Sequence, residues 1–359
     1  MRIASVGTAF PPYRYPQTVI TEALKKRVLD DRPSIPGIMD RLHSNCGVDF
    51  RNISFPLETL GSLTGLGPNN DRWIKVAVEL GEQSVCIALH NAGLEPFDIS
   101  AIFFNSHTGI ACPSIDARLV NKMGFPRDIK RTPIFGLGCA AGVAGIARAI
   151  DYVRAYPDQY ALLVCVELCS LNWQENDHSM AHIIASGLFG DGAGAVIIAG
   201  ADTPHGQRAT SVERPCPRVV ATRSIMYPDT EYLTGWDIQN NGFNIILHPD
   251  VPEMVRTTLR GTVDEFLDDN DLSLSNICSF IFHSGGPKIL QAMESSLDLP
   301  PHALAASWNS LRQRGNLSSV SVLTVMQEYL YNRPGSPGCY SMMGSTGPAF
   351  CTELALLQW

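Results

Sequence analysis

The sequence predicts an α/β protein built from two similar halves, with helices on both faces of its sheets. Continuous apolar runs at residues 161–167, 194–198 and 280–283 are typical of strands that are buried on both faces. Helical spacing of apolar residues separates these runs, most clearly at 73–92 and 251–268. If the helices of the two halves share a central layer, the chain folds into five layers in the order αβαβα.

An internal repeat indicates the two halves. Residues 98–106 align without a gap with residues 276–284, an offset of 178 (276 − 98). Gly138-Cys139 aligns with Gly315-Asn316 at nearly the same offset, 177 (315 − 138). Between these repeats, residues 201–217 hold three prolines, two arginines and few apolar residues, which is typical of a linker. We therefore expect an N-terminal half at 1–205 and a C-terminal half at 206–359.

Composition limits the classes of function. The chain has 359 residues, 45% of them hydrophobic, and its formal charge of −8 argues against general nucleic-acid binding. No apolar tract approaches the ~18 residues of a membrane span, and the N-terminus lacks the apolar stretch of a signal peptide. The ten cysteines are scattered without a CxxC pair, so we expect reduced thiols in a cytoplasmic protein.

Cys139 is the first candidate for a functional residue. Its neighbours Gly138, Ala140, Ala141 and Gly142 are all small, and helical spacing of apolar residues follows them. This pattern predicts a closely packed helix with the thiol at its first turn, where unpaired amide groups favour the thiolate. A free cysteine is also often a small buried hydrophobe, so its position alone leaves both interpretations open.

Two further side chains complete a possible catalytic group. His283 follows an apolar strand, and Asn316 begins a helix in the second half. As imidazolium, His283 would hold the Cys139 thiolate as an ion pair, while Asn316 would bond a developing oxyanion. Taken singly, His283 is also compatible with a structural histidine and Asn316 with a helix cap. The three residues alone do not exclude a cysteine protease, in which the asparagine would orient the histidine.

A metal site is not expected. His178 and His182 lie four residues apart and would share a helix face, but His178 is not followed by Glu and no third ligand is evident.

Four motifs resemble those of type III polyketide synthases, the chalcone synthase-like members of the thiolase superfamily. They are Gly138-Cys139-Ala140-Ala141-Gly142, Leu188-Phe189-Gly190-Asp191-Gly192-Ala193, His283-Ser284-Gly285-Gly286-Pro287 and Gly315-Asn316-Leu317-Ser318-Ser319. The resemblance runs in order through the whole chain, and Gly-Gly-Pro after the histidine favours this branch over enzymes that start fatty-acid synthesis. It implies a thiolase-like αβαβα fold.

The resemblance also implies a mechanism. Cys139 takes an acyl group from coenzyme A, and His283 and Asn316 stabilise the enolate that forms when malonyl-coenzyme A loses carbon dioxide. The enolate then lengthens the acyl chain until a ring closes. No metal or redox cofactor is implied, and a homodimer is expected.

Further positions follow from the resemblance. Phe189 matches a gatekeeper phenylalanine, Ile245 stands where a second aromatic gatekeeper is usual, and Cys112 matches a residue that reaches into the partner's cavity. Cavity-lining positions are matched by Asn172, Ser318 and Trp236. Arg51 is the first candidate for a basic residue at the coenzyme A tunnel mouth, and Arg41 is the second. The C-terminal Gly-Phe-Gly-Pro-Gly loop of the family is altered here to residues 344–349 and is expected to shape the cyclisation chamber.

The missing second phenylalanine and the Gly235-Trp236-Asp237 run look like bacterial members that use long fatty acyl starters. The expected products are alkylpyrones or alkylresorcinols. Two alternatives remain: a single-round β-ketoacyl synthase of the KAS III type, which would give a linear product, and a catalytically silent thiolase-like protein.

Overall fold

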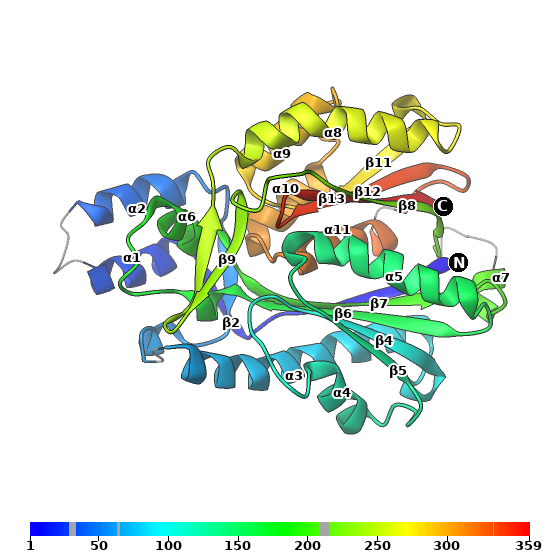
Figure 1. Ribbon diagram of the computed structural model, residues 1–359, viewed down its shortest axis with the longest axis horizontal. Coiled ribbons are helices and arrows are strands. Elements are labelled where there is room, and N and C mark those ends of the chain that lie inside the picture. Colours follow the sequence, from blue (N-terminus) through cyan, green and yellow to red (C-terminus); the bar gives the residue numbers. More distant parts are fainter. Residues whose placement is uncertain (29–33, 63–64, 209–214, 333) are drawn as a thin grey trace.

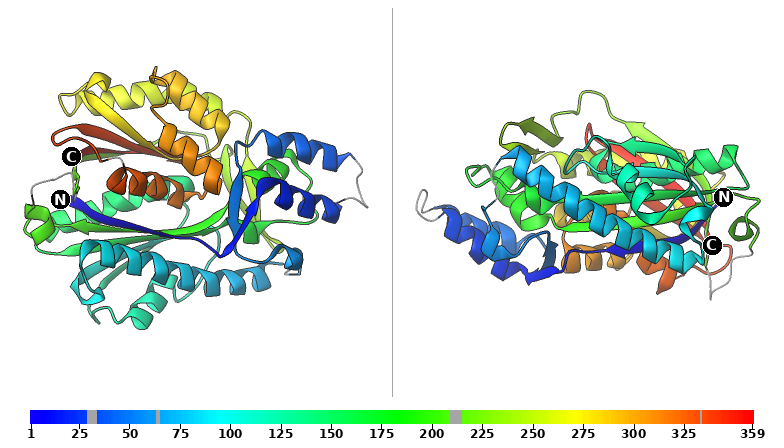
Figure 2. Two further views of the ribbon diagram at one scale, coloured as in Figure 1. Left: turned by 180° about the vertical axis from the view of Figure 1, so that it is seen from behind. Right: turned by 90° about the horizontal axis from the view of Figure 1, so that it is seen from below.

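The computed structural model describes residues 1–28, 34–62, 65–208, 215–332 and 334–359, and it has five layers (Figure 1). Helices α3 and α4 form one outer layer and α8 and α9 the other, while α5 and α11 lie between two halves of the sheet. The predicted αβαβα fold is thus confirmed. The two termini lie close together, at the end of the molecule opposite α1 and α2 (Figure 2).

The strands of the N-terminal half run in the order β1-β7-β6-β4-β5, and those of the C-terminal half in the order β11-β12-β13-β8. The two sets join at the ends of β1 and β8, where Arg2 pairs with Arg218. The bounds are β1 Arg2–Ala9, β4 Ile99–Asn105, β5 Lys130–Ile134, β6 Tyr160–Leu168, β7 Asp191–Ala199, β8 Arg218–Met226, β11 Ile277–Phe282, β12 Tyr340–Gly347 and β13 Cys351–Gln358.

Two short antiparallel pairs lie outside this sheet, β2 Tyr13–Pro16 with β3 Phe50–Ile53 and β9 Thr234–Gln239 with β10 Gly242–Leu247. The α-helices are α1 Gln17–Val28, α2 Ile35–Ser44, α3 Leu66–Ala92, α4 Ile115–Met123, α5 Ala141–Ala155, α6 Met180–Leu188, α7 Pro204–Gln207, α8 Val251–Asp268, α9 Pro287–Ser296, α10 Ala305–Arg314 and α11 Ser319–Tyr331. The 3-10 helices are η1 Leu57–Thr59, η2 Pro96–Asp98, η3 Gly138–Ala140, η4 Cys169–Asn172 and η5 Leu274–Asn276.

The internal repeat read from the sequence is visible in the elements. Strand β11 begins 178 residues after β4 (277 − 99), and α11 begins 178 residues after α5 (319 − 141). The turns η2 and η5, which precede β4 and β11, are related by the same offset and carry the same type of capping box. Equivalent elements of the two halves therefore begin at one offset.

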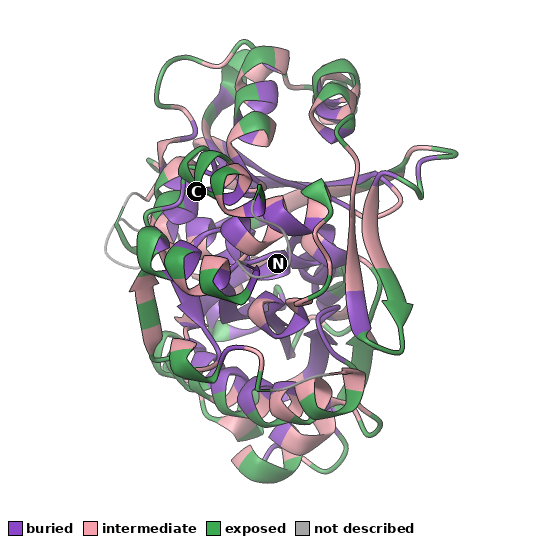
Figure 3. Ribbon diagram, turned by 90° about the vertical axis from the view of Figure 1, so that its left-hand side faces the viewer, coloured by how far each residue is buried: buried purple, intermediate pink, exposed green. Residues whose placement is uncertain are grey.

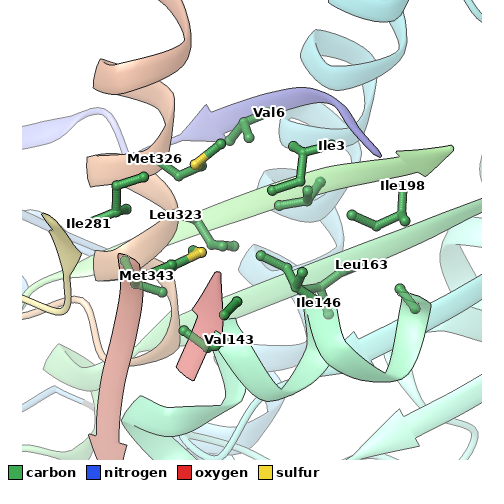
Figure 4. Packing of buried hydrophobic residues seen from close by; sticks show 14 of the residues in the cluster. Ile3, Val6, Val143, Ile146, Leu163, Ile198, Ile281, Leu323, Met326 and Met343 are labelled. Carbon is green, nitrogen blue, oxygen red and sulfur yellow. The ribbon is translucent and has the colours of Figure 1, made fainter. Parts of the chain in front are cut away.

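The layers of the fold divide the hydrophobic core into separate clusters. Apolar residues of the inner strands meet those of α5 and α11 in a central cluster that includes Val143, Ile146, Leu163, Leu323 and Met343 (Figure 4). Separate clusters fill the spaces beneath α3 and beneath α8 and α9. The buried residues accordingly follow the sheet and the central helices, whereas the outer helices expose one face (Figure 3). Continuous burial along β6 and β7 explains their unbroken apolar runs.

Several expectations need adjustment. Helix α3 begins at Leu66 rather than at residue 73. The expected linker contains helix α7, and its residues 209–214 lie outside the described residues. The division into halves at residue 205 stays a prediction. In the part of the chain that the structure describes, no helix combines the length and apolar character that crossing a bilayer requires.

Candidate active site

Cys139 lies in η3, immediately before α5, at the junction that the sequence predicted. Gly138 makes this turn with φ at 48°, a left-handed conformation that favours glycine. Cys139 is half-buried as a residue, η3 packs against α11, and the side chains of Asn316 and Ser318, which precede α11, lower the pKa of the thiol. The nucleophile candidate of one half therefore contacts the loop that begins α11 in the other half.

Asn316 is held from both sides of its carboxamide. Its Oδ1 accepts a hydrogen bond from the Ser318 backbone N–H at 2.7 Å, and its Nδ2 donates to the Gly285 carbonyl at 3.0 Å. These contacts fix which end of the amide is nitrogen, and they leave the second Nδ2 hydrogen for the region beside Cys139. Ser318 itself has φ at 51°, which is rare for a residue with a side chain and points to a constrained loop.

His283 follows β11 and lies against the same loop. Its backbone N–H donates to the Gly344 carbonyl at 2.9 Å, and a Cβ placed on Gly285 would lie 3.3 Å from the ring's Nε2. The ring is 2% exposed, and its Nδ1 has no hydrogen-bond partner among the described residues. Because Asn316 binds the carbonyl of Gly285, the imidazole and the carboxamide lie on either side of one glycine.

Burial of both residues opposes the expected ion pair between Cys139 and His283. Burial raises the pKa of the Cys139 thiol to about 12, although the hydrogen bonds from Ser318 and Asn316 oppose the rise. Burial likewise lowers the pKa of His283 to about 4. In both groups the loss of solvation disfavours the charged form, against the favourable field at the start of the helix. No hydrogen bond joins the two side chains in the described structure.

The altered C-terminal segment packs behind the nucleophile. Residues 344–347 belong to β12 rather than to a loop, and a Cβ on Gly347 would collide with Leu137 and Ala140. A Cβ on Gly138 would in turn lie only 2.6 Å from the Pro348 ring. This close backbone approach requires glycine at both positions. It packs the turn that holds Cys139 directly against the C-terminal segment around Gly347 and Pro348.

A buried polar cluster that the sequence analysis missed lies beside Ser318. Glu167 is fully buried on β6, and its Oε1 lies 3.2 Å from His107 Nδ1. The Ser318 hydroxyl lies 3.4 Å from the same ring nitrogen. The available signals were a single glutamate within the apolar run at 162–169 and four polar residues in a row at 105–108, where β4 ends.

Most of the residues predicted to line the cavity surround one apolar pocket, but Ser318 is fully buried and is not among its lining residues. Its empty volume is about 580 Å³, including the open mouth, and five of the predicted residues line it: Arg51, Asn172, Phe189, Trp236 and Ile245. Trp236 and Ile245 are direct cross-strand neighbours on β9 and β10. Phe189 is positioned by Asn316, since its two neighbours Leu188 and Gly190 hydrogen-bond to the backbone of that residue.

The sequence analysis expected Arg51 to lie at an exposed tunnel mouth, but the structure places it elsewhere. Its side chain is buried, with Nε donating to Gln17 at 2.9 Å and Nη1 donating to the Phe189 carbonyl at 2.6 Å. Burial also lowers its pKa to about 10. These contacts make Arg51 a support for the Phe189 segment, whereas the second candidate, Arg41, is exposed on α2.

Two remaining predicted features lie apart from the pocket. Cys112 is exposed, between the exposed Ile110 and the start of α4, and it is not among the residues that line the pocket. Among the described residues, no group of three or more histidine, cysteine or acidic side chains is arranged to hold a metal ion.

Comparison with known proteins agrees with this geometry. Residues 2–203 match the N-terminal domain of chalcone and stilbene synthases, and residues 218–334 match the C-terminal domain. The chain is 42% identical to a 1,3,6,8-tetrahydroxynaphthalene synthase of Streptomyces peucetius, covering 99% of this chain and 93% of the relative. It is 32% identical to a putative chalcone synthase of Bacillus subtilis, over 99% and 98% of the two chains.

A solved crystal structure agrees with the family models and with the two relatives. The crystal structure of 1,3,6,8-tetrahydroxynaphthalene synthase from Streptomyces coelicolor, a bacterial type III polyketide synthase, superposes with a TM-score of 0.92 at 30% identity. The match covers 100% of this chain and 99% of the other. Over its whole length, the chain belongs to the chalcone and stilbene synthase family, the type III polyketide synthases, and is a condensing acyltransferase that acts on coenzyme A thioesters.

Proposed function

We propose that Cys139, His283 and Asn316 carry the condensation. Cys139 attacks an acyl-coenzyme A thioester and holds the starter. The free Nδ2 hydrogen of Asn316 and a ring N–H of His283 then bond the thioester oxygen of malonyl-coenzyme A as carbon dioxide leaves and the enolate forms. A neutral imidazole suits this role because it donates a hydrogen bond without neutralising the enolate by full proton transfer. The enolate carbon attacks the acyl-Cys139 carbonyl and the chain grows by two carbons.

The support for these roles is the arrangement itself. The Asn316 side chain lowers the pKa of the Cys139 thiol, and Asn316 hydrogen-bonds to the backbone of Gly285, two residues after His283. Loss of carbon dioxide supplies the driving force, so this chemistry calls for no metal or redox cofactor.

We propose that the product is an aromatic polyketide of the 1,3,6,8-tetrahydroxynaphthalene type, built from malonyl-coenzyme A alone. The single observation that carries this assignment is the 42% identity, over almost the whole chain, to a relative of that name. The ten carbons of that naphthalene, with oxygen in 1,3 relationships, correspond to five two-carbon units joined head to tail. A starter supplied by malonyl-coenzyme A itself accounts for all of them.

A long fatty acyl starter is the second candidate, favoured by the pocket. Its lining is mainly apolar, and Ile20, Leu24, Ile53, Leu57 and Leu60 extend it from Phe189 towards α1 and η1. An acyl chain bound there would bury its methylene groups at about 0.8 kcal/mol each. Extension and lactonisation would then give the alkylpyrone, or ring closure the alkylresorcinol, that the sequence analysis expected.

We also propose that the enzyme acts as a homodimer. The support is two large exposed apolar side chains, Ile110 (56% exposed) and Phe135 (51% exposed), on the segments that follow the paired strands β4 and β5. Large exposed apolar side chains often mark protein–protein contacts. Cys112 would then project towards the partner's cavity.

The starter is tested by incubating the enzyme with ¹³C-labelled malonyl-coenzyme A, with and without a series of acyl-coenzyme A thioesters. Formation of a fully labelled tetrahydroxynaphthalene from malonyl-coenzyme A alone supports the first assignment. Product formation only when a fatty acyl thioester is added supports the second. A linear β-ketoacyl product would indicate a single-round synthase, and no product from any thioester would contradict the proposal. Cys139→Ala is the control for non-enzymatic condensation.

A further inference from the structure

The outermost strand of the C-terminal half leads directly to His283. Strand β11 stands at the end of the sheet order, so among the described strands it is hydrogen-bonded only to β12. His283 follows its last residue, and the backbone N–H of His283 donates to the carbonyl of Gly344 on β12 at 2.9 Å. An edge strand has a row of backbone groups without a strand partner and separates from its sheet more easily than an inner strand. Any link between β11 and β12 therefore also helps to hold His283 in place.

Cys339 lies immediately before β12, at the opposite end of the two strands from His283, and a tight turn fixes its backbone. Its N–H donates to the Ser336 carbonyl at 3.0 Å. Between these two residues lie Pro337 and Gly338, the types that a type II turn prefers, and Gly338 has φ at 85°. The carbonyl of Cys339 accepts a hydrogen bond from the Trp359 N–H at 3.0 Å. The position of the thiol relative to β12 is thus well defined.

Cys278 lies at an irregular step near the start of β11. Ile277 is paired with Tyr340, and the next pairing joins Ser279 with Ser341. Two steps along β11 therefore correspond to one step along β12, and Cys278 is the extra residue of this bulge. Its side chain is exposed, whereas Ile277 on one side of it is buried.

The thiols of Cys278 and Cys339 are brought together by this register. The hydroxyls of Ser279 and Ser341 lie 2.5 Å apart, and Cys339 precedes Ser341 by two residues, which places it on the same face of the strands. Both cysteines line one surface hollow. Neighbouring strands are about 4.8 Å apart, within the range of roughly 4.4–6.8 Å between the Cα atoms of a disulfide. The Cys339 side chain, ahead of burial, also raises the pKa of the Cys278 thiol.

We propose that Cys278 and Cys339 form a disulfide when the protein meets a peroxide, and that this bridge fastens the edge strand β11 to β12. The thiolate of one cysteine attacks a peroxide oxygen, the O–O bond breaks, and a sulfenic acid and one water form. The second thiolate attacks that sulfur, the S–O bond breaks, and a second water leaves. The two sulfurs lose two electrons, which reduce hydrogen peroxide to two water molecules together with the two thiol protons.

The reduced pair is the resting state. Cys278 is exposed, so a peroxide in solvent reaches it directly. The raised pKa of its thiol slows the reaction at neutral pH, because the thiolate is the reactive form. An exposed disulfide also exchanges readily with small thiols, so the bridge is reversible in a compartment buffered by glutathione. The pair therefore responds to sustained exposure to oxidant.

The first test is a search for the cross-link. The enzyme is treated with hydrogen peroxide at pH 8, its remaining thiols are alkylated, and it is digested without reductant. We expect one linked pair of peptides that contain Cys278 and Cys339, separated again by dithiothreitol and absent from Cys278→Ser and Cys339→Ser. Cys86→Ser is the matched control and should keep the link, because Cys86 is also exposed but no cysteine is among the groups that shift its pKa.

A second measurement tests what the bridge does. Oxidised wild type is expected to exchange the amide hydrogens of β11 more slowly than reduced wild type, by roughly threefold or more, and to unfold at a temperature higher by roughly 5 °C. Neither change should occur in Cys278→Ser. Cys139 is present in both proteins, so its own oxidation cancels in the comparison.

Two results would overturn the proposal. Oxidation that leaves Cys278 and Cys339 unlinked, or that links them only to cysteines of other chains, would show that the pair does not form the bridge. A bridge that leaves the exchange of β11 unchanged would show that it does not fasten the strand. Both measurements need no substrate, so their outcome is independent of the proposed function.

Discussion

The side-chain amide of Asn316 donates a hydrogen bond to the backbone carbonyl of Gly285 at 3.0 Å. This contact links the loop that follows β11 to the loop that precedes α11. It therefore fixes the positions of the His283 and Asn316 motifs relative to each other, although the two bonded residues are 31 positions apart (316 − 285). The same side chain lowers the pKa of the Cys139 thiol in the other half. Asn316 thus acts on groups from both repeats at the active site.

Replacing Asn316 by Ala should separate loading from condensation. The variant loses the donor to the enolate oxygen, for which a reduction of condensation by about 10²–10³-fold is expected. Acylation of Cys139 should persist, because the nucleophilic thiol itself is unchanged. Intact mass reports loading, and release of labelled carbon dioxide from malonyl-coenzyme A reports decarboxylation. Full condensing activity in Asn316→Ala would remove this residue from the mechanism.

Ile245→Phe should reduce the size of starter that the pocket accepts. Ile245 lies opposite Trp236 and lines the pocket, so the larger ring would fill space beside Phe189. We expect relative activity to shift towards shorter acyl-coenzyme A starters, measured as kcat/KM across a chain-length series. Ile238→Phe on the same hairpin is the control, since Ile238 is 49% exposed and is not a lining residue. An identical chain-length profile in both variants would contradict the assignment.

Gly142→Ala should destabilise the contact between the central helices. A Cβ on Gly142 would overlap the carbonyl oxygen of Ser319 and the Val322 side chain, which belong to α11. Backbone atoms cannot move aside without separating α5 from α11, so a loss of about 1–3 kcal/mol in unfolding free energy is expected. Gly261→Ala on α8 is the control, because no atom lies within 4 Å of its added Cβ and helix propensity favours Ala. Equal denaturation midpoints for the two variants would argue against this packing.

Lowering the pH should reduce the free energy of unfolding, because histidines that are buried in the fold resist protonation. Burial, followed by the charge of Arg51, lowers the pKa of His43 from 6.5 to about 4. The unfolded chain binds a proton below pH 6.5 that the folded chain excludes, so stability falls as pH drops from about 7 to 4 and then levels off. At pH 5 one such histidine accounts for about 2 kcal/mol at most.

Urea unfolding of wild type and His43→Gln at pH 7.5 and pH 5 measures that contribution. The variant starts from its own stability, so the informative quantity is the difference between the two pH values. A smaller loss on acidification is expected for His43→Gln. An equal loss in both proteins would show that His43 titrates normally in the folded chain.

Much of the layered fold could be predicted because the chain repeats its own pattern. The unbroken apolar runs of β6 and β7 and the common offset of 178 between β4 and β11 directly reflect two-sided burial and duplication. The short pairs β2–β3 and β9–β10 were not predicted. Each is only four to six residues long and carries little periodic signal.

The convergence of Cys139 and Asn316 could also be predicted, since they hold nearly equivalent positions in the two repeats. The protonation states of the active-site residues could not be predicted from the sequence. The thiolate expected from the helix start depends on solvation, and burial, which opposes the charged forms of Cys139 and His283, becomes visible only in the packed structure. The burial of Arg51 and the contact between His107 and Glu167 could not be predicted either, because segments remote in sequence set the environments of these residues.

The most direct test of the central claim is the mass of the enzyme after brief exposure to acyl-coenzyme A without malonyl-coenzyme A. Digestion then locates the added acyl group. The account predicts one acyl group per chain on the peptide that contains Cys139, absent from Cys139→Ala. An acyl group on another cysteine, or polyketide formation by Cys139→Ala, would contradict it.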